Sequence, residues 1–254
     1  MKIYCCQIDI AWENKAANQA KVMALLDQVV PAEGSLVVLP EMFSTGFSMN
    51  VSSISEGSSR ETEMFLAAVA SKYDIFMLGG IVTSGPGGRG RNEAVIFDPD
   101  GKEIARYCKM HPFTFGGEAE HYEAGPAATI FEWRDFKVAP FICYDLRFPE
   151  IFRGAVRRGA QLFTVIANWP QAREMHWITL LQARAIENQA YVAGVNRCGN
   201  DPKLSYSGRS LIIDPRGEII ADAGNEEGVI SADLDLPSLL DYRRQFPVLE
   251  DMKG

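Results

Sequence analysis

A cysteine that ends an apolar run is the residue of this chain best suited to nucleophilic chemistry. Cys143 follows the stretch KVAPFI and precedes a helix predicted to begin near Pro149, so its sulfur is expected where a strand meets a loop. A thiolate there could attack an amide carbonyl, provided that a base removes the thiol proton and a donor stabilises the oxyanion. Taken alone, a cysteine after an apolar run is more often a buried structural residue, because cysteine is among the most buried residue types.

A glutamate ends a second apolar run. Glu41 follows Leu39 and Pro40 in SLVVLPEMF, at the carboxyl end of a predicted strand, which is the edge where sites of α/β proteins assemble. Its apolar neighbours would partly desolvate the carboxylate, which suits it to accept and return a proton. Considered alone, Glu41 is better explained as a loop glutamate that caps a helix or pairs at the surface.

A lysine stands at the end of a third predicted strand. Lys109 lies in RYCKMHPF, where Met110, Pro112 and Phe113 restrict its access to water. A lysine in such a place is ordinarily solvated. If it points toward Cys143 instead, its compact ammonium charge favours a thiolate and the oxyanion that follows.

The histidines are the rival partners for a reactive cysteine, because cysteine with histidine is the commoner pair in thiol hydrolases. His111, His121 and His176 show no His-x-His or His-x-x-x-His spacing, so no metal site is expected. His111 flanks Lys109 and is expected to shape the pocket. His176 is expected to pack in the interior or to cap a helix.

The elements that must position these side chains alternate between short apolar runs and helical patterns. The runs are near-continuously apolar, which indicates strands that are covered on both faces. Strands are predicted at 2–8, 35–40, 74–82, 93–97, 137–144, 161–169, 190–196 and 210–214. Helices are predicted at 14–30, 61–73 and 174–190, where apolar residues recur at helical spacing. The pattern is typical of an α/β fold.

An internal similarity divides the chain into two related halves. FDPDGKEIA at 97–105 resembles IDPRGEIIA at 213–221, and each reads as strand, turn and strand. Each half also offers a helix followed by a short strand that ends in a proline-containing loop, at 35–43 and at 162–170. Two α/β layers that face each other would fit this arrangement. The glycine-rich segment 112–127 between strands is expected to close over a site.

Length, composition and charge limit the partners. The 254 residues, 47% of them hydrophobic, suffice for one large core, so a single domain over residues 1–254 is expected. The net charge of −8 and the absence of a long apolar run predict neither nucleic-acid nor membrane binding and leave a small-molecule substrate. The five cysteines are odd in number and form no Cys-x-x-Cys pair, so no disulfide framework is expected. The amino terminus lacks a signal-peptide pattern. Both observations predict a cytoplasmic protein.

The stretches LPEMFSTGF, KMHPF and CYDLRFPE, in this order, resemble the nitrilase, or carbon-nitrogen hydrolase, superfamily. The similarity continues through ANWP, RAIENQAYVAGVNRCG and DPRGEII, so it covers essentially the whole chain. LPEMFSTGF is most similar to the ω-amidase branch, which hydrolyses the terminal amide of 2-oxo dicarboxylic acid monoamides such as 2-oxoglutaramate. The resemblance implies a four-layer αββα sandwich, no cofactor, and a homodimer formed through segments 148–158 and 174–188.

The resemblance also implies roles for the residues singled out above. Cys143 would be the nucleophile that forms a thioester, Glu41 the general base and later acid, and Lys109 the group that stabilises the tetrahedral intermediate. The family has a second glutamate between the lysine and the cysteine. Glu118 is favoured for that role over Glu120 and Glu123 by its spacing to Gly125.

The remaining expectations concern the substrate pocket. The backbone N–H of Tyr144, which follows the nucleophile, would help to bind the oxyanion. A substrate carboxylate needs a cation, for which Arg173 and Arg197 are the candidates. The apolar part of the pocket is expected to involve Phe47, Trp169 and Tyr206. The charged neighbours of the nucleophile are expected to support its turn and a subunit interface: Asp145, Arg147 and Glu150.

Other activities stay open at this stage. An aliphatic amidase, an N-carbamoyl amino acid amidohydrolase or a nitrilase would use the same fold and residues, since these do not determine the substrate. A non-catalytic scaffold on the same fold is a further alternative. The presence of Glu41, Lys109 and Cys143 together argues against it.

Overall fold

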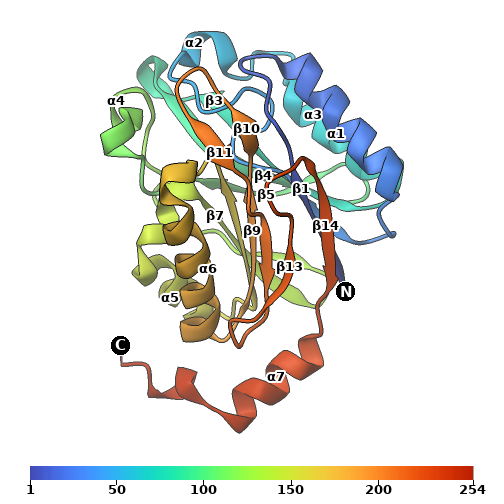
Figure 1. Cartoon of the computed structure of the whole chain (residues 1–254), viewed down its shortest axis with the longest axis vertical. Helices are drawn as coiled ribbons and strands as arrows, with labels where there is room; N and C mark the ends of the chain where they lie inside the picture. The colour runs from blue at the N-terminus through green and yellow to red at the C-terminus, as the bar shows by residue number, and fades with distance from the viewer. Residues whose placement is uncertain (254) are drawn as a thin grey trace.

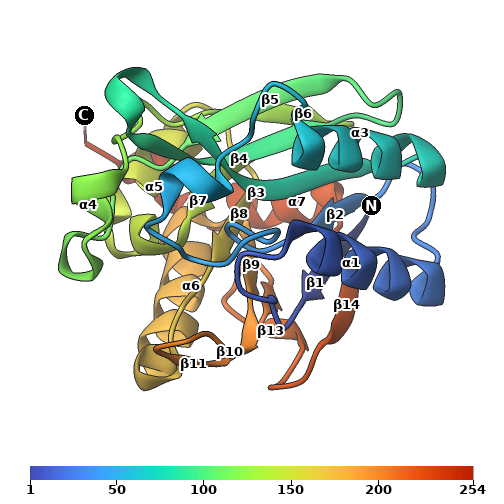
Figure 2. The same cartoon turned by 90° about the horizontal axis from the view of Figure 1, so that it is seen from above.

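The computed structural model describes residues 1–253 of the chain. Two six-stranded sheets pack face to face, and helices cover the outer side of each (Figures 1 and 2). This arrangement is the αββα sandwich that the resemblance implied, so the predicted fold class is confirmed. Within the described residues, none of the helices combines the length and hydropathy that a bilayer span requires.

The two sheets share one plan. In the first sheet the spatial order is β14 (Gly228–Asp233), β1 (Lys2–Gln7), β2 (Leu36–Val38), β3 (Phe76–Ser84), β4 (Gly90–Phe97) and β5 (Glu103–Cys108). In the second sheet it is β6 (Phe131–Trp133), β7 (Phe136–Ile142), β8 (Leu162–Ala167), β9 (Tyr191–Asn196), β12 (Leu211–Ile213) and β13 (Ile219–Asp222). In both, three central parallel strands are flanked by antiparallel ones. The predicted two halves are therefore present, and β14 occupies in the first sheet the place that β6 has in the second.

Helices α1 (Lys15–Val29) and α3 (Glu61–Tyr73) cover the first sheet, and α5 (Pro149–Arg157) and α6 (Glu174–Asn188) cover the second (Figure 2). The side chain of Asn14 accepts a hydrogen bond from the backbone N–H of Ala17, which caps the start of α1. Pro149 occupies the first turn of α5, where the missing N–H is harmless. Shorter helices are α2 (Val51–Ile54) and α4 (Glu118–His121), and α7 (Leu236–Gln245) follows β14.

Burial on both faces explains why the strands are so apolar. In β1, Ile3 and Cys5 belong to the core between the two sheets, whereas Tyr4 and Cys6 pack in the separate cluster beneath α1 and α3. Every predicted strand has a counterpart in the structure, and the unpredicted strands β6, β10 (Cys198–Asn200), β11 (Ser205–Ser207) and β14 are short or lie at sheet edges. Short or half-exposed strands leave too weak a pattern to be recognised.

Candidate active site

The loop that carries Glu41 crosses directly over β3. The backbone N–H of Leu39 donates to the carbonyl of Leu78 and that of Phe43 to the carbonyl of Gly80, which keeps this loop against the strand. A Cβ atom on Gly80 would lie 2.6 Å from the Cα of Glu41, so only glycine permits this approach. Glu41 is fully buried as a result.

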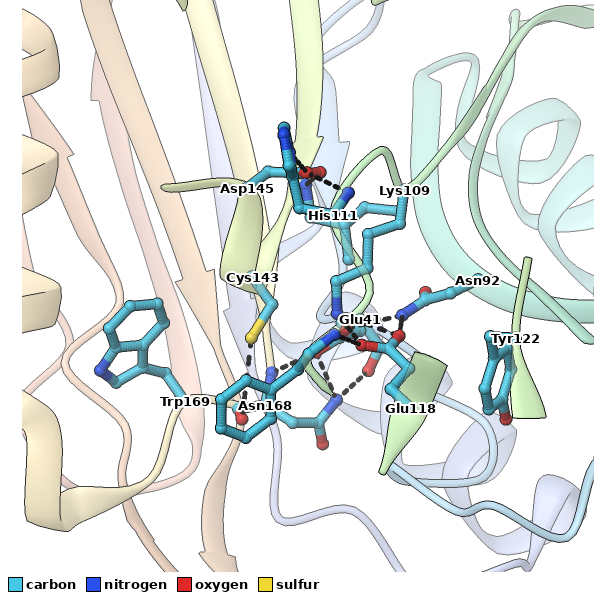
Figure 3. Close-up of polar contacts among 12 residues, drawn as sticks. Glu41, Asn92, Lys109, His111, Glu118, Tyr122, Cys143, Asp145, Asn168 and Trp169 are labelled. Carbon is cyan, nitrogen blue, oxygen red and sulfur yellow. Dashed lines mark hydrogen bonds and ion pairs between the residues drawn. The ribbon is translucent and has the colours of Figure 1, made fainter. Parts of the chain in front are cut away.

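Cys143 occupies a sharp bend at the end of β7. Its φ of 48° lies in the left-handed region, which is costly for a residue other than glycine and is typical of functional sites. The bend opens the 3-10 turn η3 (Cys143–Arg147). The Cys143 side chain points toward Asn168, and its Sγ lies 4.0 Å from the carbonyl oxygen of that residue, to which it donates (Figure 3).

Asp145 ties this bend to the end of β5. Its Oδ2 accepts hydrogen bonds from the backbone N–H of Ile142 (3.1 Å) and from the hydroxyl of Tyr107 (2.7 Å). Its Oδ1 accepts from the backbone N–H of His111 (3.0 Å) and lies 2.8 Å from the Nδ1 of that histidine. Asp145 therefore links the turn of Cys143 to the segment that carries Lys109.

Lys109 lies between two carboxylates in the interior (Figure 3). Its Nζ donates to Oε1 of Glu41 at 2.9 Å and to Oε1 and Oε2 of Glu118 at 3.0 and 2.8 Å. The three side chains are almost completely buried. Of the three acids that compete in the sequence, Glu118 is the one that reaches this cluster. The glycine-rich segment 112–127 thus delivers a side chain to the site.

Two asparagines complete the cluster. The Nδ2 of Asn92 donates to Oε1 of Glu41 (2.7 Å) and to Oε1 of Glu118 (2.9 Å). The backbone N–H of Asn168 donates to Oε2 of Glu41 (2.8 Å), and its Nδ2 donates to the backbone carbonyl of Glu41 (2.7 Å). Sequence reasoning does not assign either residue a role, although Asn92 directly precedes the predicted strand 93–97 and Asn168 belongs to the motif ANWP.

The protonation states follow from burial and from the neighbouring charges. Burial disfavours the charge of Lys109, but the charges of Glu118 and Glu41 outweigh this and hold the pKa of the ammonium well above its usual value. Burial raises the pKa of Glu118; Lys109 opposes this rise and Glu41 adds to it. Burial and then the charge of Glu41 raise the pKa of the Cys143 thiol well above its usual value, against the effect of Lys109. The resting thiol is therefore neutral and needs a base before it can attack.

Cys143 opens into a cavity of about 420 Å³. Of the predicted pocket residues, Phe47, Tyr144, Trp169, Arg173 and Tyr206 line it. Further lining residues that the sequence reasoning does not name are Trp12, Met49, Asp201, Lys203 and Leu204.

Arg197 is a different case, and its expected contact with substrate is wrong. Its side chain is fully buried and does not line the cavity. Its guanidinium donates instead to backbone carbonyls, among them those of Ile10 and Asn200, and pairs with Asp9. A position at the end of an apolar strand does not reveal whether a long side chain will face the cavity or be buried in the interior.

The structure also differs from the expectations for Arg147, His111 and His176. Arg147 does not merely support the turn, because it lines the cavity, where its guanidinium lies 4.8 Å from the centre of the Trp169 ring. His111 does not face the cavity but stacks on Phe148 with ring centres 3.8 Å apart. His176 is exposed, and its Nδ1 lies 3.2 Å from Nη2 of Arg147.

The arrangement has the parts that acyl transfer requires. The Cys143 thiol opens into the cavity, the buried carboxylate of Glu41 and ammonium of Lys109 lie beside it in the interior (Figure 3), and the backbone N–H of Tyr144 follows the thiol directly. Among residues 1–253, no group of three or more histidine, cysteine, aspartate or glutamate side chains is arranged to hold a metal ion.

Known proteins match this chain over nearly its whole length. The family model described as carbon-nitrogen hydrolase matches residues 2–244. The chain is 40% identical to an omega-amidase YafV of Yersinia enterocolitica, covering 99% of this chain and 96% of that protein. It is 34% identical to a 2-oxoglutaramate amidase of Bacillus subtilis, covering 99% and 97%. The crystal structure of XC1258 from Xanthomonas campestris, a CN-hydrolase superfamily protein with an arsenic adduct in its active site, matches with a TM-score of 0.92 at 33% identity, covering 100% and 97%.

Proposed function

The chain belongs to the carbon-nitrogen hydrolase family and is an amide-hydrolysing enzyme, and we propose that it removes the terminal amide of a small 2-oxo dicarboxylic acid monoamide such as 2-oxoglutaramate. The relatives named omega-amidase and 2-oxoglutaramate amidase support this substrate class. Such a substrate carries a carboxylate at the end remote from its amide.

The charge of the cavity is the observation that carries the proposal. Arg147, Arg173 and Lys203 line it, and within residues 1–253 none of them forms an ion pair with a carboxylate. The chain as a whole carries a net charge of −8, so a cavity lined by three cations and one carboxylate, that of Asp201, stands out. Burying a substrate carboxylate without a cation would cost far more than binding could return.

The first half of the proposed reaction forms a thioester. Glu41 removes the proton of the Cys143 thiol, and the sulfur attacks the amide carbon. The charge that develops on the amide oxygen is stabilised by the ammonium of Lys109 and by the backbone N–H of Tyr144. Glu41 then returns the proton to the nitrogen, the C–N bond breaks, and ammonia leaves.

The second half releases the acid. Glu41 removes a proton from a water molecule, whose oxygen attacks the thioester carbon, and the C–S bond breaks with the proton returned to the sulfur. Glu118 shares Lys109 and Asn92 with Glu41, and it holds the ammonium in place throughout. The reaction consumes water and needs no cofactor.

We extend the proposal to the state of the protein in the cell. A cytoplasmic homodimer of single-domain chains that binds no nucleic acid and no membrane is proposed, with pairing through segments 148–158 and 174–188. The exposed apolar side chains of Met175 (75% exposed) and Ile186 (53% exposed) on α6 support pairing at this surface. Analytical ultracentrifugation of wild type and of Ile186→Glu tests it, with a monomeric wild type as the contrary result.

A screen of ammonia release tests the substrate. The wild-type enzyme should hydrolyse 2-oxoglutaramate and 2-oxosuccinamate faster than glutamine, an uncharged aliphatic amide, a nitrile or an N-carbamoyl amino acid. Faster turnover of one of the latter would replace the proposed substrate by that class. No turnover of any of them would favour a scaffold.

A further inference from the structure

A small hairpin forms one wall of the cavity. Strands β10 and β11 pair with each other, apart from the two large sheets, and Figure 1 shows them above the main body of the second sheet. The turn between them presents Lys203 and Leu204, and β11 carries Tyr206; all three line the cavity. β11 also packs against the turn η4 (Gln171–Arg173), which carries Arg173.

The base of this hairpin is clamped by Arg197. Its Nη2 donates to the backbone carbonyl of Asn200 (2.8 Å) and to that of Ile10 (3.2 Å), and it pairs with Asp9 (3.2 Å). The guanidinium carbon lies 4.5 Å from the centre of the Tyr206 ring. One buried side chain thus joins the hairpin to segment 9–10.

A glycine shows independently how tightly the hairpin is seated. A Cβ atom on Gly199 would lie 2.0 Å from Oδ1 of Asp9, so a larger residue there would displace the carboxylate that pairs with Arg197. The φ of Gly199 is +76°, which adds a second reason for glycine. The backbone N–H of Cys198 also donates to the carbonyl of Ile8 at 3.0 Å, so the base of the hairpin is bonded to segment 8–10 through its backbone as well.

The carboxylate of Asp201 organises the turn of the hairpin. Oδ1 of Asp201 accepts from the backbone N–H groups of Lys203 and Leu204, both at 2.7 Å, and its Oδ2 accepts from the hydroxyl of Tyr206 at 2.5 Å. Lys203 lines the cavity and is exposed, and its ammonium forms no hydrogen bond or ion pair among the described residues. A turn closed by three hydrogen bonds to Asp201 therefore presents an unpaired lysine side chain to the cavity.

We propose that this hairpin determines the substrate specificity of the site: Lys203 binds the remote carboxylate of the substrate, and Arg197 is the positioning residue that holds Lys203 in reach. The inference rests on the proposed function, because it takes the substrate to be a carboxylate-bearing amide. It adds to that function a cation supplied by the hairpin, beside Arg173 on the adjacent turn. A lysine suits this role, since its point charge can follow carboxylates of different chain length.

The contribution of Lys203 is tested by comparing two substrates. Lys203→Gln should lower kcat/KM for 2-oxoglutaramate, relative to kcat/KM for a small uncharged amide, by about tenfold, as loss of a charge-assisted contact implies. The loss should appear as a higher KM, and Lys203→Arg should restore most of it. Lys102→Gln, on the exposed turn between β4 and β5, is the matched control and should behave like wild type. An unchanged ratio in Lys203→Gln would overturn the proposal.

The contribution of Arg197 needs a readout that mere structural damage would not give. Arg197→Lys keeps the charge but loses the planar fork, so the hairpin should loosen and the KM for 2-oxoglutaramate should rise several-fold, about three- to tenfold, more than that for the uncharged amide. In the Lys203→Gln background the same substitution should have little further effect on this ratio, because both act through one contact. An equal loss on both substrates, or full additivity of the two changes, would contradict the positioning role.

Failure of the inference and failure of the proposed function give different results. If wild type prefers an uncharged amide, a nitrile or a carbamoyl compound, the proposed function is wrong. Competitive inhibition by glutarate then tests the hairpin alone, since glutarate carries the carboxylate without a reactive amide. Inhibition that weakens about tenfold in Lys203→Gln supports the hairpin as a carboxylate site, and inhibition that is unchanged refutes it.

Discussion

The two halves of the molecule repeat one arrangement of strands but place different residues at corresponding strand ends. β2 of the first sheet ends near a charged residue, Glu41, whereas its counterpart β8 in the second sheet ends near a neutral amide, Asn168. β1 contains a thiol, Cys6, that is buried beneath helices, whereas its counterpart β7 ends at the bent Cys143. The repeat of the fold brings the strand ends together, and the residue types decide which half supplies charge and which supplies the nucleophile.

Neither half could act alone, because the contacts that organise the site cross between them. Asn168 of the second half donates to Glu41 of the first, and Asp145 of the second half accepts from Tyr107 and His111 of the first. The charged half thus receives its orientation from the half that carries the nucleophile. Substitutions at equivalent positions of the two halves should therefore have very unequal effects.

The thiols of the two halves should show the largest contrast. Cys143→Ala should lower turnover by roughly 10⁴-fold or more, because no other group can form the thioester. Cys6→Ala should retain activity, since Cys6 packs beneath α1 and α3. Mass spectrometry of a stalled reaction should locate the acyl group on the Cys143 peptide. An adduct on Cys6 or another cysteine would reverse the assignment.

Substitution of the charged residues of the first half should have the second-largest effect on turnover. Glu41→Gln and Lys109→Ala should each lower kcat by roughly 10²-fold or more, the usual cost of losing a general base or an oxyanion donor. His111→Asn and His176→Asn should be far milder, because His111 bonds to Asp145 and His176 contacts Arg147, whereas neither is bonded to Cys143 in the described residues. Steady-state ammonia release measures all four variants. A histidine variant that abolishes activity while Glu41→Gln does not would require a cysteine–histidine mechanism.

Loss of the Asp145 hydrogen bonds between the two halves should lower kcat less than loss of the catalytic groups that these bonds position. Asp145→Asn replaces an acceptor with a donor that faces the Ile142 N–H and the Tyr107 hydroxyl, so kcat should fall about tenfold and the melting temperature should drop. Asp100→Asn, an exposed aspartate on the turn between β4 and β5, is the control. Wild-type kcat in Asp145→Asn would show that the bend of Cys143 holds without this link.

The smallest effect on turnover, but a clear effect on stability, concerns Cys6. Burial raises the pKa of its thiol to about 12, above the value of about 8.5 expected in the unfolded chain. The protonated Cys6 thiol contributes to the free energy of unfolding. This contribution is fully present below the thiol pKa of the unfolded chain and is lost as pH rises toward the pKa of the folded chain. Between about pH 8 and about pH 10, wild type should therefore lose about 2 kcal/mol more unfolding free energy than Cys6→Ala.

Urea titrations at the two pH values measure this difference. Val37→Ala is the matched control, because it removes buried volume from the same cluster without removing a titrating group. It should lower stability by a similar amount at both pH values. A pH dependence of Cys6→Ala equal to that of wild type would show that Cys6 does not titrate differently in the folded state.

Much of the fold could be predicted because its signals are local. The apolar runs locate the strands, and the two similar turns at 97–105 and 213–221 reveal the repeat that the two sheets display. The edge strand β14 was not predictable in this way. It is half exposed and joins the first sheet although it follows the second in sequence, so only packing decides where it pairs.

The sequence by itself determined the residue types at the strand ends, Glu41, Lys109 and Cys143, and the family to which the chain belongs. The tertiary structure decided that Glu118 is the acid that pairs with Lys109 and that asparagines donate to the two glutamates. It also decided that Arg197 is buried behind the residues that line the cavity. The physical reason is distance along the chain. Local patterns report which face of an element is buried, whereas the hydrogen bond from Asn168 to Glu41 spans 127 residues and exists only after both sheets have packed.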